Sequence, residues 1–146
     1  MTDVVTIVFD HGVSAQAVGA LAQARGWRPT GDTPRGHDVL ASRRYVADDD
    51  TEILHGEDHN GACRFLRVEG KRAAAIEGEV RAALSCVTSA QVLTRLAEGD
   101  ALACIRTAGM LMRIRPATFD LRHFQALCAL LTHDEVALRR AGIRAA

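Results

Sequence analysis

The sequence predicts an α+β protein, in which a small N-terminal α/β unit of order β-α-β-β-β-α caps a short C-terminal array of helices. In the first half, short apolar runs rich in β-branched residues alternate with turn residues, which is typical of strands. In the second half, Ala, Leu and Arg dominate, and apolar residues recur at helical spacing. A pattern in that half also repeats after 33 residues, a period typical of stacked helical hairpins. We therefore expect one unit at residues 1–87 and a second unit of two helical hairpins at residues 88–146.

Local signals place the first strand and helix of the α/β unit. The apolar run at residues 4–9 ends at Asp10-His11-Gly12, which predicts a buried strand followed by a turn. Ser14 can cap the next helix, because its hydroxyl accepts a hydrogen bond from a free backbone N–H, and Gly26 can close it. Residues 27–38 contain two Pro and two Gly without periodicity, so we expect a loop there, with at most a short edge strand around Trp27.

Three further strands and a helix complete this predicted unit. Asn60-Gly61 is a two-residue hairpin signal, because both positions tolerate the positive φ of a type I′ turn. The strand after it is apolar on both faces, which favours a position near the middle of the sheet. The helix that follows has an apolar stripe and a Glu77–Arg81 pair on its solvent side, so it should pack on the sheet. The expected ranges are 43–47, 51–57 and 62–68 for the strands and 71–86 for the helix.

The composition excludes several classes of function. Of the 146 residues, 48% are hydrophobic and 25% are charged, as in an ordinary globular protein. The 18 Lys and Arg balance the 18 Asp and Glu, and this zero net charge disfavours broad binding to nucleic acid or anionic membranes. Aromatic residues make up 4%, which leaves few platforms for stacked bases. The chain has no apolar run of the roughly 18 residues that a membrane span needs and no signal-peptide pattern, so a cytoplasmic location is expected.

The zero net charge hides an asymmetry between the two halves. Residues 1–70 carry seven Arg and eleven Asp or Glu, whereas residues 71–146 carry eleven Lys or Arg and seven Asp or Glu. The halves therefore have net charges of −4 and +4. This difference allows a charge-matched contact between the units of one molecule or between two copies.

The four cysteines show no metal-binding or redox spacing. Cys63, Cys86, Cys104 and Cys128 form no CxxC pair and have apolar neighbours, so we expect buried structural thiols. The sequence also lacks a GxGxxG motif, a P-loop and a Ser or Cys nucleophile motif. It therefore predicts no cofactor and no catalytic residue.

The repeat in the second half aligns Ile105-Arg106-Thr107-Ala108-Gly109-Met110 with Leu138-Arg139-Arg140-Ala141-Gly142-Ile143. Each copy has the layout of a helical hairpin, and a capping box at Thr88 and Gln91 begins the first. Pro116 ends the second helix of the first copy, because proline cannot continue a helix. The expected helices are residues 89–98, a second helix that follows Gly99-Asp100 and ends before Pro116, residues 120–131 and residues 135–146.

Residues 134–146, preceded by a Leu-rich helix, resemble the second helix of a HEAT repeat, and residues 100–111 form a weaker copy. The resemblance covers residues 88–146 and implies structural roles for four side chains. Asp100 and Asp134 would cap the second helices, and Arg106 and Arg139 would form a ladder with acidic groups of the neighbouring repeat. HEAT arrays mainly present binding surfaces, so the resemblance implies a partner protein and no activity.

The N-terminal half is similar to the small α/β domain that precedes HEAT repeats in some uncharacterised bacterial proteins. The segment His55-Gly56-Glu57-Asp58-His59-Asn60-Gly61 carries this similarity. It implies no activity.

Two repeats are fewer than the roughly three that a free-standing array needs. The α/β unit can cap the first repeat through its helix at residues 71–86, but nothing follows Ala146 to cap the last. Either the molecule forms a homo-oligomer through this open end, or the chain is a fragment of a longer array. The apolar residues of interest there are Phe124, Val136, Leu138 and Ile143.

The segment from His55 to His59 has the residue types that bind metal ions. Imidazole and carboxylate groups are ligands for zinc, so His55, Glu57 and His59 would support a metal-dependent hydrolase. On a strand, however, His55 and Glu57 share one face while Asp58 points away, and His59 lies in the turn. The preferred interpretation is a solvated hairpin tip, with no metal site.

The sequence thus favours a non-enzymatic protein-protein interaction or scaffolding module, which binds through the helical array, the acidic hairpin face or both. The alternative is an immunity-type inhibitor, in which acidic side chains neutralise a basic effector protein and speed its association. The Asp48-Asp49-Asp50 run lacks EF-hand spacing, so it predicts a charged turn and no calcium site. Neither nucleic acid nor membrane is an expected partner. The candidate partner-binding residues are Asp48, Asp49, Asp50, Glu57, Asp58 and His59.

Overall fold

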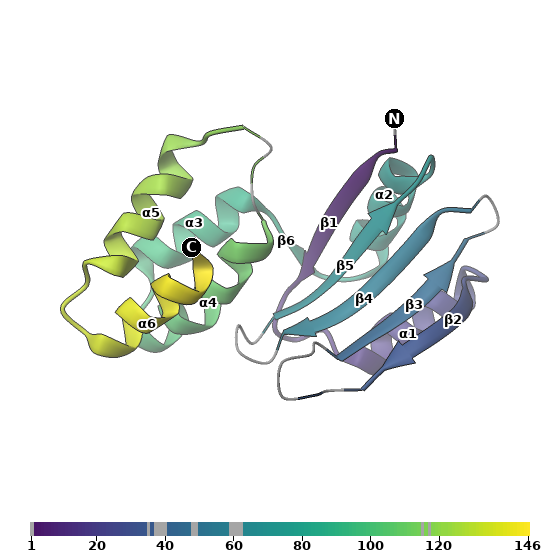
Figure 1. The fold of residues 1–146 in the computed structure, drawn as a ribbon, viewed down its shortest axis with the longest axis horizontal. Coiled ribbons are helices and arrows are strands. Elements are labelled where there is room, and N and C mark those ends of the chain that lie inside the picture. Colours follow the sequence, from purple (N-terminus) through teal and green to yellow (C-terminus); the bar gives the residue numbers. More distant parts are fainter. Residues whose placement is uncertain are drawn as a thin grey trace. The chain divides into compact units, whose positions relative to one another are not determined.

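The computed structural model of the chain describes residues 2–34, 36, 41–47, 50–58, 63–114, 116 and 118–146. These residues form six strands and six helices, which confirms the predicted α+β class (Figure 1). The chain divides into two compact units, one of residues 1–58 and 64–86 and the other of residues 59–63 and 87–146. None of the described helices is long and apolar enough to cross a membrane.

The strands form one antiparallel sheet in the order β2-β3-β4-β5-β1-β6. Strand β5 lies between β4 and β1, so the prediction that this strand is central is confirmed. The turn expected at Asn60-Gly61 lies outside the described residues. The strands are β1 (Val4–Phe9), β2 (Arg28–Thr33), β3 (Ala41–Val46), β4 (Glu52–Asp58), β5 (Cys63–Glu69) and β6 (Cys86–Val87).

Strand β2 corrects the expectation of a loop over residues 27–38. All six residues of β2 are exposed, so the strand has no alternation of apolar and polar residues by which the sequence could predict it. Its backbone pairs with β3, and the register shifts between Pro29 and Gly31. A proline and a bulge are devices that keep an edge strand from pairing with other chains.

Two helices, α1 (Ala15–Ala24) and α2 (Ala73–Ala83), lie on the same side of the sheet (Figure 1). The predicted cap of α1 is confirmed, because the Ser14 hydroxyl accepts a hydrogen bond from the backbone N–H of Ala17. Gly26 follows this helix with a φ of 69°, a left-handed conformation that favours glycine. Helix α2 ends at Ala83, three residues before the predicted end, and the chain continues into β6.

The core of the α/β unit lies between the sheet and these two helices. Helix α1 contributes Val18 and Leu21, and α2 contributes Ile76 and Val80. The predicted Glu77–Arg81 ion pair is present at 2.9 Å on the other side of α2. The strands and adjoining loops contribute Ile7, Phe9, Trp27, Tyr45, Ile53, Leu66 and Val68.

The second unit contains four helices that form two hairpins, α3–α4 and α5–α6. The capping box predicted at α3 is confirmed, because Thr88 and Gln91 exchange hydrogen bonds between side chain and backbone. Helix α4 packs on α3 and α6, and α5 packs on α3 and α6. The helices are α3 (Ser89–Glu98), α4 (Ala101–Arg113), α5 (Leu121–Leu131) and α6 (Val136–Ala145).

Candidate functional site

Exposed apolar side chains gather on the second helical hairpin. Burial of a large apolar side chain is favourable by about 1.5 to 3 kcal/mol, so a group of such side chains on a surface needs an explanation. Of the eight exposed large apolar residues in the described part of the chain, five belong to α5 or α6, and a sixth, Phe119, lies two residues before α5. We call these six the α5–α6 surface; they are Phe119, Leu121, Phe124, Leu131, Val136 and Ile143.

Phe119 and Phe124 mark the beginning of α5. Asp120 is the N-cap residue of this helix, and its carboxylate accepts hydrogen bonds from the backbone N–H groups of Arg122 and His123. These bonds, with the nearby Arg122 charge, hold the pKa of Asp120 below its usual range. Phe119 precedes the cap and Phe124 is the fourth helical residue, which is the spacing of a hydrophobic staple.

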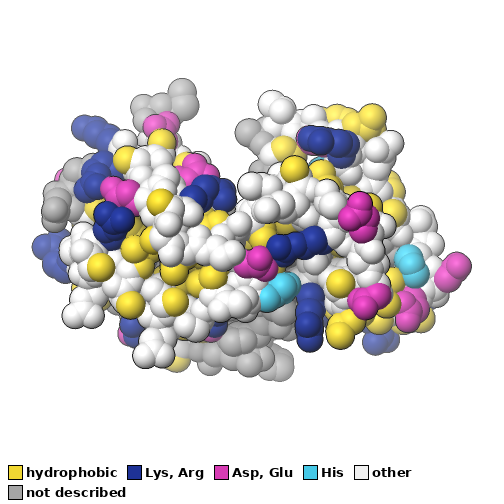
Figure 2. All heavy atoms as spheres, turned by 180° about the vertical axis from the view of Figure 1, so that it is seen from behind, with side chains coloured by type: hydrophobic (Ala, Val, Ile, Leu, Met, Phe, Trp, Pro, Cys, Tyr) yellow, Lys and Arg dark blue, Asp and Glu magenta, His cyan; other side chains and the backbone are white. Residues whose placement is uncertain are grey.

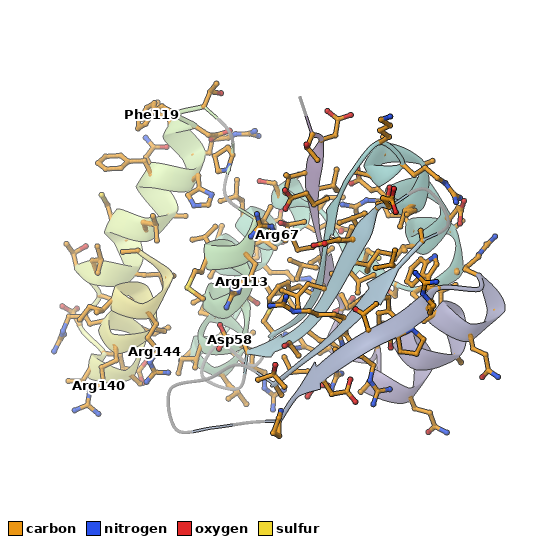
Figure 3. All side chains as sticks on the ribbon, turned by 45° about the vertical axis from the view of Figure 1, so that its right-hand side comes forward. Asp58, Arg67, Arg113, Phe119, Arg140 and Arg144 are labelled. Carbon is orange, nitrogen blue, oxygen red and sulfur yellow. The ribbon has the colours of Figure 1, made fainter. Side chains whose placement is uncertain are left out.

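The staple is formed, but it does not bury its first ring. The ring centroids of Phe119 and Phe124 lie 5.8 Å apart, with an angle of 50° between their planes. Phe119 nevertheless remains 77% exposed, and its side chain projects outward from the start of α5 (Figure 3). A staple alone therefore does not account for an aromatic residue at this position.

A recess of about 360 Å³ lies beside these rings, between the beginning of α5 and the end of α6. The rings of Phe119 and Phe124 line it together with Leu127, Pro116 and Ala145. Its size and apolar walls suit one large apolar side chain of a binding partner.

Helix α6 presents apolar and cationic groups on its exposed side. Val136, Arg140 and Ile143 are spaced by four and three residues, so they share one face of the helix. Leu138, Ala141, Gly142 and Ala145 form the buried side. Of the four apolar residues of interest at the open end, three are exposed, and Leu138 is in the core.

The 33-residue repeat allows matched positions of α4 and α6 to be compared. Ala108 and Ala141 are both buried, as are Gly109 and Gly142. The residue after each glycine differs, since Met110 has no exposed surface and Ile143 is 66% exposed. Thr107 and Arg140 differ in the same way, because Thr107 is buried and Arg140 is exposed. The helix face that holds Thr107 and Met110 is therefore buried on α4, whereas the equivalent face of α6, with Arg140 and Ile143, is exposed.

The four repeat positions have different local roles. Asp100 caps α4, because its carboxylate accepts a hydrogen bond of 2.8 Å from the Ala103 N–H. Glu135 occupies the N-cap of α6 without a side-chain cap bond, and Asp134 precedes it. Arg139 donates hydrogen bonds to the carbonyl oxygens of His133 and Asp134, which closes the turn before α6. Arg106 is exposed, with no ion pair to another residue that the structure describes.

The acidic candidates for partner binding do not form one exposed group. Glu57 pairs with Arg64 at 3.0 Å and is partly buried, and Asp58, its neighbour on β4, is 8% exposed. Asp50 is exposed, in a turn where its φ is 66°. Asp48, Asp49 and His59 lie outside the described residues. Positive and negative side chains are interspersed on the face drawn in Figure 2.

His55 and Glu57 share one face of β4, as strand geometry requires, and Asp58 belongs to the other. Burial lowers the pKa of His55 to about 4, and the charges of Arg64 and Arg43 act in the same direction against the opposing charge of Glu57. His55 is therefore neutral at pH 7. Within the described part of the chain, no three His, Cys, Asp or Glu side chains are grouped to hold a metal ion. The metal-dependent hydrolase stays a prediction that depends on His59.

Comparison with known proteins gives no relative: no family model, curated protein or solved structure matches the chain. The likeness to HEAT repeats stays a prediction. Sequence reasoning selected Phe124, Val136 and Ile143 but missed Phe119, Leu121 and Leu131. The signal for Phe119 was its position one residue before the capping Asp120, five residues before a second Phe.

Proposed function

We propose that the chain is a non-enzymatic interaction module that binds a helical segment of another protein on the α5–α6 surface. The difference between Met110 and Ile143 carries this proposal, because the same repeat position is fully buried on α4 and 66% exposed on α6. Helix α6 packs on α4. A further helix that packs on α6 would bury Ile143 and Val136 as the corresponding residues of a stacked hairpin are buried.

The chemistry of the surface supports a particular kind of partner segment. Arg140 lies between Val136 and Ile143 and projects outward from α6 (Figure 3), so a carboxylate on the partner would face it. The recess between Phe119, Phe124 and Ala145 would receive one large apolar side chain. The expected partner is an amphipathic helix with acidic residues beside its apolar stripe.

Affinity capture with matched variants tests this proposal. Ile143→Asp and Phe119→Ser alter exposed positions of the surface, so the fold should be kept while binding is lost. Leu102→Asp is the control, because Leu102 is 57% exposed but belongs to α4 of the first hairpin. We expect a protein that the wild type and Leu102→Asp retain and that both surface variants lose.

Two results would contradict the proposal. Proteins retained equally by all four chains would show that the α5–α6 surface does not bind them. The α5–α6 surface could also bind a second copy of this chain, and sedimentation of the wild type at increasing concentration tests this. A dimer that Ile143→Asp dissociates would replace the separate partner with self-association.

A further inference from the structure

The α/β unit contains a second feature that the interaction function does not use, a row of polar side chains across three strands. Asp32 of β2 pairs in register with Arg43 of β3, and Arg43 pairs with His55 of β4. Because paired residues of neighbouring strands point to the same face, the three side chains lie side by side on one face of the sheet. Tyr45 and Ile53 form the next row on this face and belong to the core beneath the helices.

A groove of about 820 Å³ lies between this polar row and helix α1. Helix α1 forms one wall of the groove with the small residues Ala15, Gly19 and Ala20. The side-chain amides of Gln16 and Gln23 also belong to this wall. The floor holds the polar row with Glu57, and Thr33 and Ser42 add hydroxyl groups. No Leu, Ile, Val, Met or Phe is among the described residues that line the groove.

Two ion pairs hold the charged groups of the floor in place. Arg43 donates from Nε to Asp32 Oδ1 at 2.8 Å and from Nη2 to Oδ2 at 3.3 Å, a bidentate arrangement. Arg64 donates to Glu57 Oε1 at 3.0 Å and also to the carbonyl oxygen of Val13, just before α1. A guanidinium has five N–H donors and a carboxylate about four acceptor positions, so the Arg43–Asp32 pair keeps capacity for further hydrogen bonds. Within the two pairs, the charges cancel.

The buried imidazole of His55 is a second, independent observation that points to a ligand. The side chain is 6% exposed, and its Nε2 atom is shielded from solvent without a hydrogen-bond partner among the described residues. Leaving a buried polar atom without a partner costs about 1 to 3 kcal/mol, so a ligand hydroxyl group that reached Nε2 would recover part of this free energy. Because the imidazole is neutral at pH 7, it offers one donor and one acceptor.

We propose that this groove binds a neutral, polyhydroxylated molecule of monosaccharide size. An ionic ligand gains little where the charges already cancel, and an apolar ligand would leave the polar groups of the floor without hydrogen bonds. A polyol has hydroxyl groups that both donate and accept, which matches the carboxylates, guanidinium, amides and imidazole of the groove. The groove lacks an aromatic platform at its surface, since Tyr45 is 4% exposed, so affinity should be in the millimolar range.

NMR titration of the intact, isotope-labelled chain tests the proposal. The probes are D-glucose, D-galactose, D-mannose, D-ribose and myo-inositol, with glucose 6-phosphate and glucosamine as charged counterparts. We expect saturable shifts with at least one neutral probe, confined to the side-chain amides of Gln16 and Gln23, the His55 ring and their neighbours. The charged counterparts should bind more weakly.

Matched variants distinguish the groove from the rest of the surface. Gln16→Ala and Arg43→Met alter exposed lining residues, so they should keep the fold and weaken the saturable shifts at least threefold. Arg81→Ala, which removes an exposed ion pair on α2, should leave them unchanged. Absence of saturable shifts with all five neutral probes, stronger binding of a charged probe, or equal behaviour of all three variants would overturn the proposal.

Discussion

Hairpin α3–α4 buries Cys104, Thr107, Met110 and Leu111 on its second helix. Hairpin α5–α6, together with Phe119 two residues before it, leaves six large apolar side chains exposed. Both hairpins have the same apolar-Arg-x-Ala-Gly-apolar pattern. The Ala and Gly of the pattern are buried in both, so they serve packing within the unit. The last apolar residue has no such fixed role, because its burial depends on whether another element covers it.

This comparison separates positions that stabilise the unit from positions that remain available to a partner. Buried members of the repeat should affect the free energy of unfolding, and exposed members should affect binding alone. Substitutions at equivalent positions of the two hairpins therefore test the account directly.

The largest difference is expected between Met110→Ala and Ile143→Ala. Met110 has no exposed surface, so its truncation should lower the free energy of unfolding by about 2 to 5 kcal/mol. Ile143 is 66% exposed, and its truncation should change that free energy by less than about 0.5 kcal/mol. Urea unfolding of both variants measures the difference. Equal losses would show that the two positions are not distinguished by burial.

Low pH should destabilise the α/β unit, because His55 is buried there. This effect is independent of both helical hairpins, so it serves as a reference for the hairpin variants. Burial lowers the pKa of His55 from 6.5 in the unfolded chain to about 4 in the fold. The unfolded chain therefore binds the extra proton between these values, so stability is fully present above pH 6.5 and falls as the pH drops to 4. The loss is about 3 kcal/mol, at 1.36 kcal/mol for each pH unit.

Unfolding of wild type and His55→Leu at pH 7, 5.5 and 4 measures this contribution. The variant should lose the part of the pH dependence that His55 provides, whereas Met110→Ala and Ile143→Ala should retain it. An unchanged pH dependence in His55→Leu would show that the folded and unfolded chains bind this proton equally.

Gly142 provides an intermediate effect within the second hairpin. A Cβ there would lie 2.8 Å from Leu130 Cβ and 3.1 Å from the Leu131 backbone nitrogen, so α6 would have to move away from α5. Gly142→Ala should therefore destabilise the chain by about 1 to 3 kcal/mol. Gly78→Ala on α2 is the control, because a Cβ at that position has open space and should stabilise the helix by about 1 kcal/mol. Thermal unfolding of both variants shows whether each substitution lowers or raises the stability of the chain.

The smallest effects are expected at the helix caps. Asp100→Ala and Asp120→Ala each remove a side-chain cap, from α4 and α5 respectively, and should cost about 1 kcal/mol. Glu135→Ala should cost less than about 0.5 kcal/mol, because the Glu135 side chain makes no cap bond and contributes only through the helix dipole. Urea unfolding can rank the three, and a loss at Glu135 as large as at Asp120 would contradict this assignment.

Sequence reasoning was most successful where the structure is local. The caps at Ser14 and Thr88 depend on hydrogen bonds within three residues, so their patterns were sufficient, whereas the cap at Asp100 was expected from the resemblance to HEAT repeats. The parity of a strand likewise placed His55 and Glu57 on one face. Pairing between distant segments was beyond local patterns. The segment of β2 was therefore expected as a loop with at most a short edge strand around Trp27, and the Asp32–Arg43–His55 row was not expected.

Burial of a repeat position was also outside the reach of the sequence pattern. Met110 and Ile143 follow the same glycine in the same motif, and only the elements packed around each helix separate them. The α5–α6 surface was therefore predicted in part, through Phe124, Val136 and Ile143, and completed by the structure.

The most direct test of the central claim is the affinity of the captured partner for the purified chain, measured by titration calorimetry. Wild type and Leu102→Asp should bind equally, whereas Ile143→Asp and Phe119→Ser should each bind at least tenfold more weakly, a loss of about 1.4 kcal/mol or more. Equal affinity of all four chains would contradict the assignment of the α5–α6 surface as the binding site.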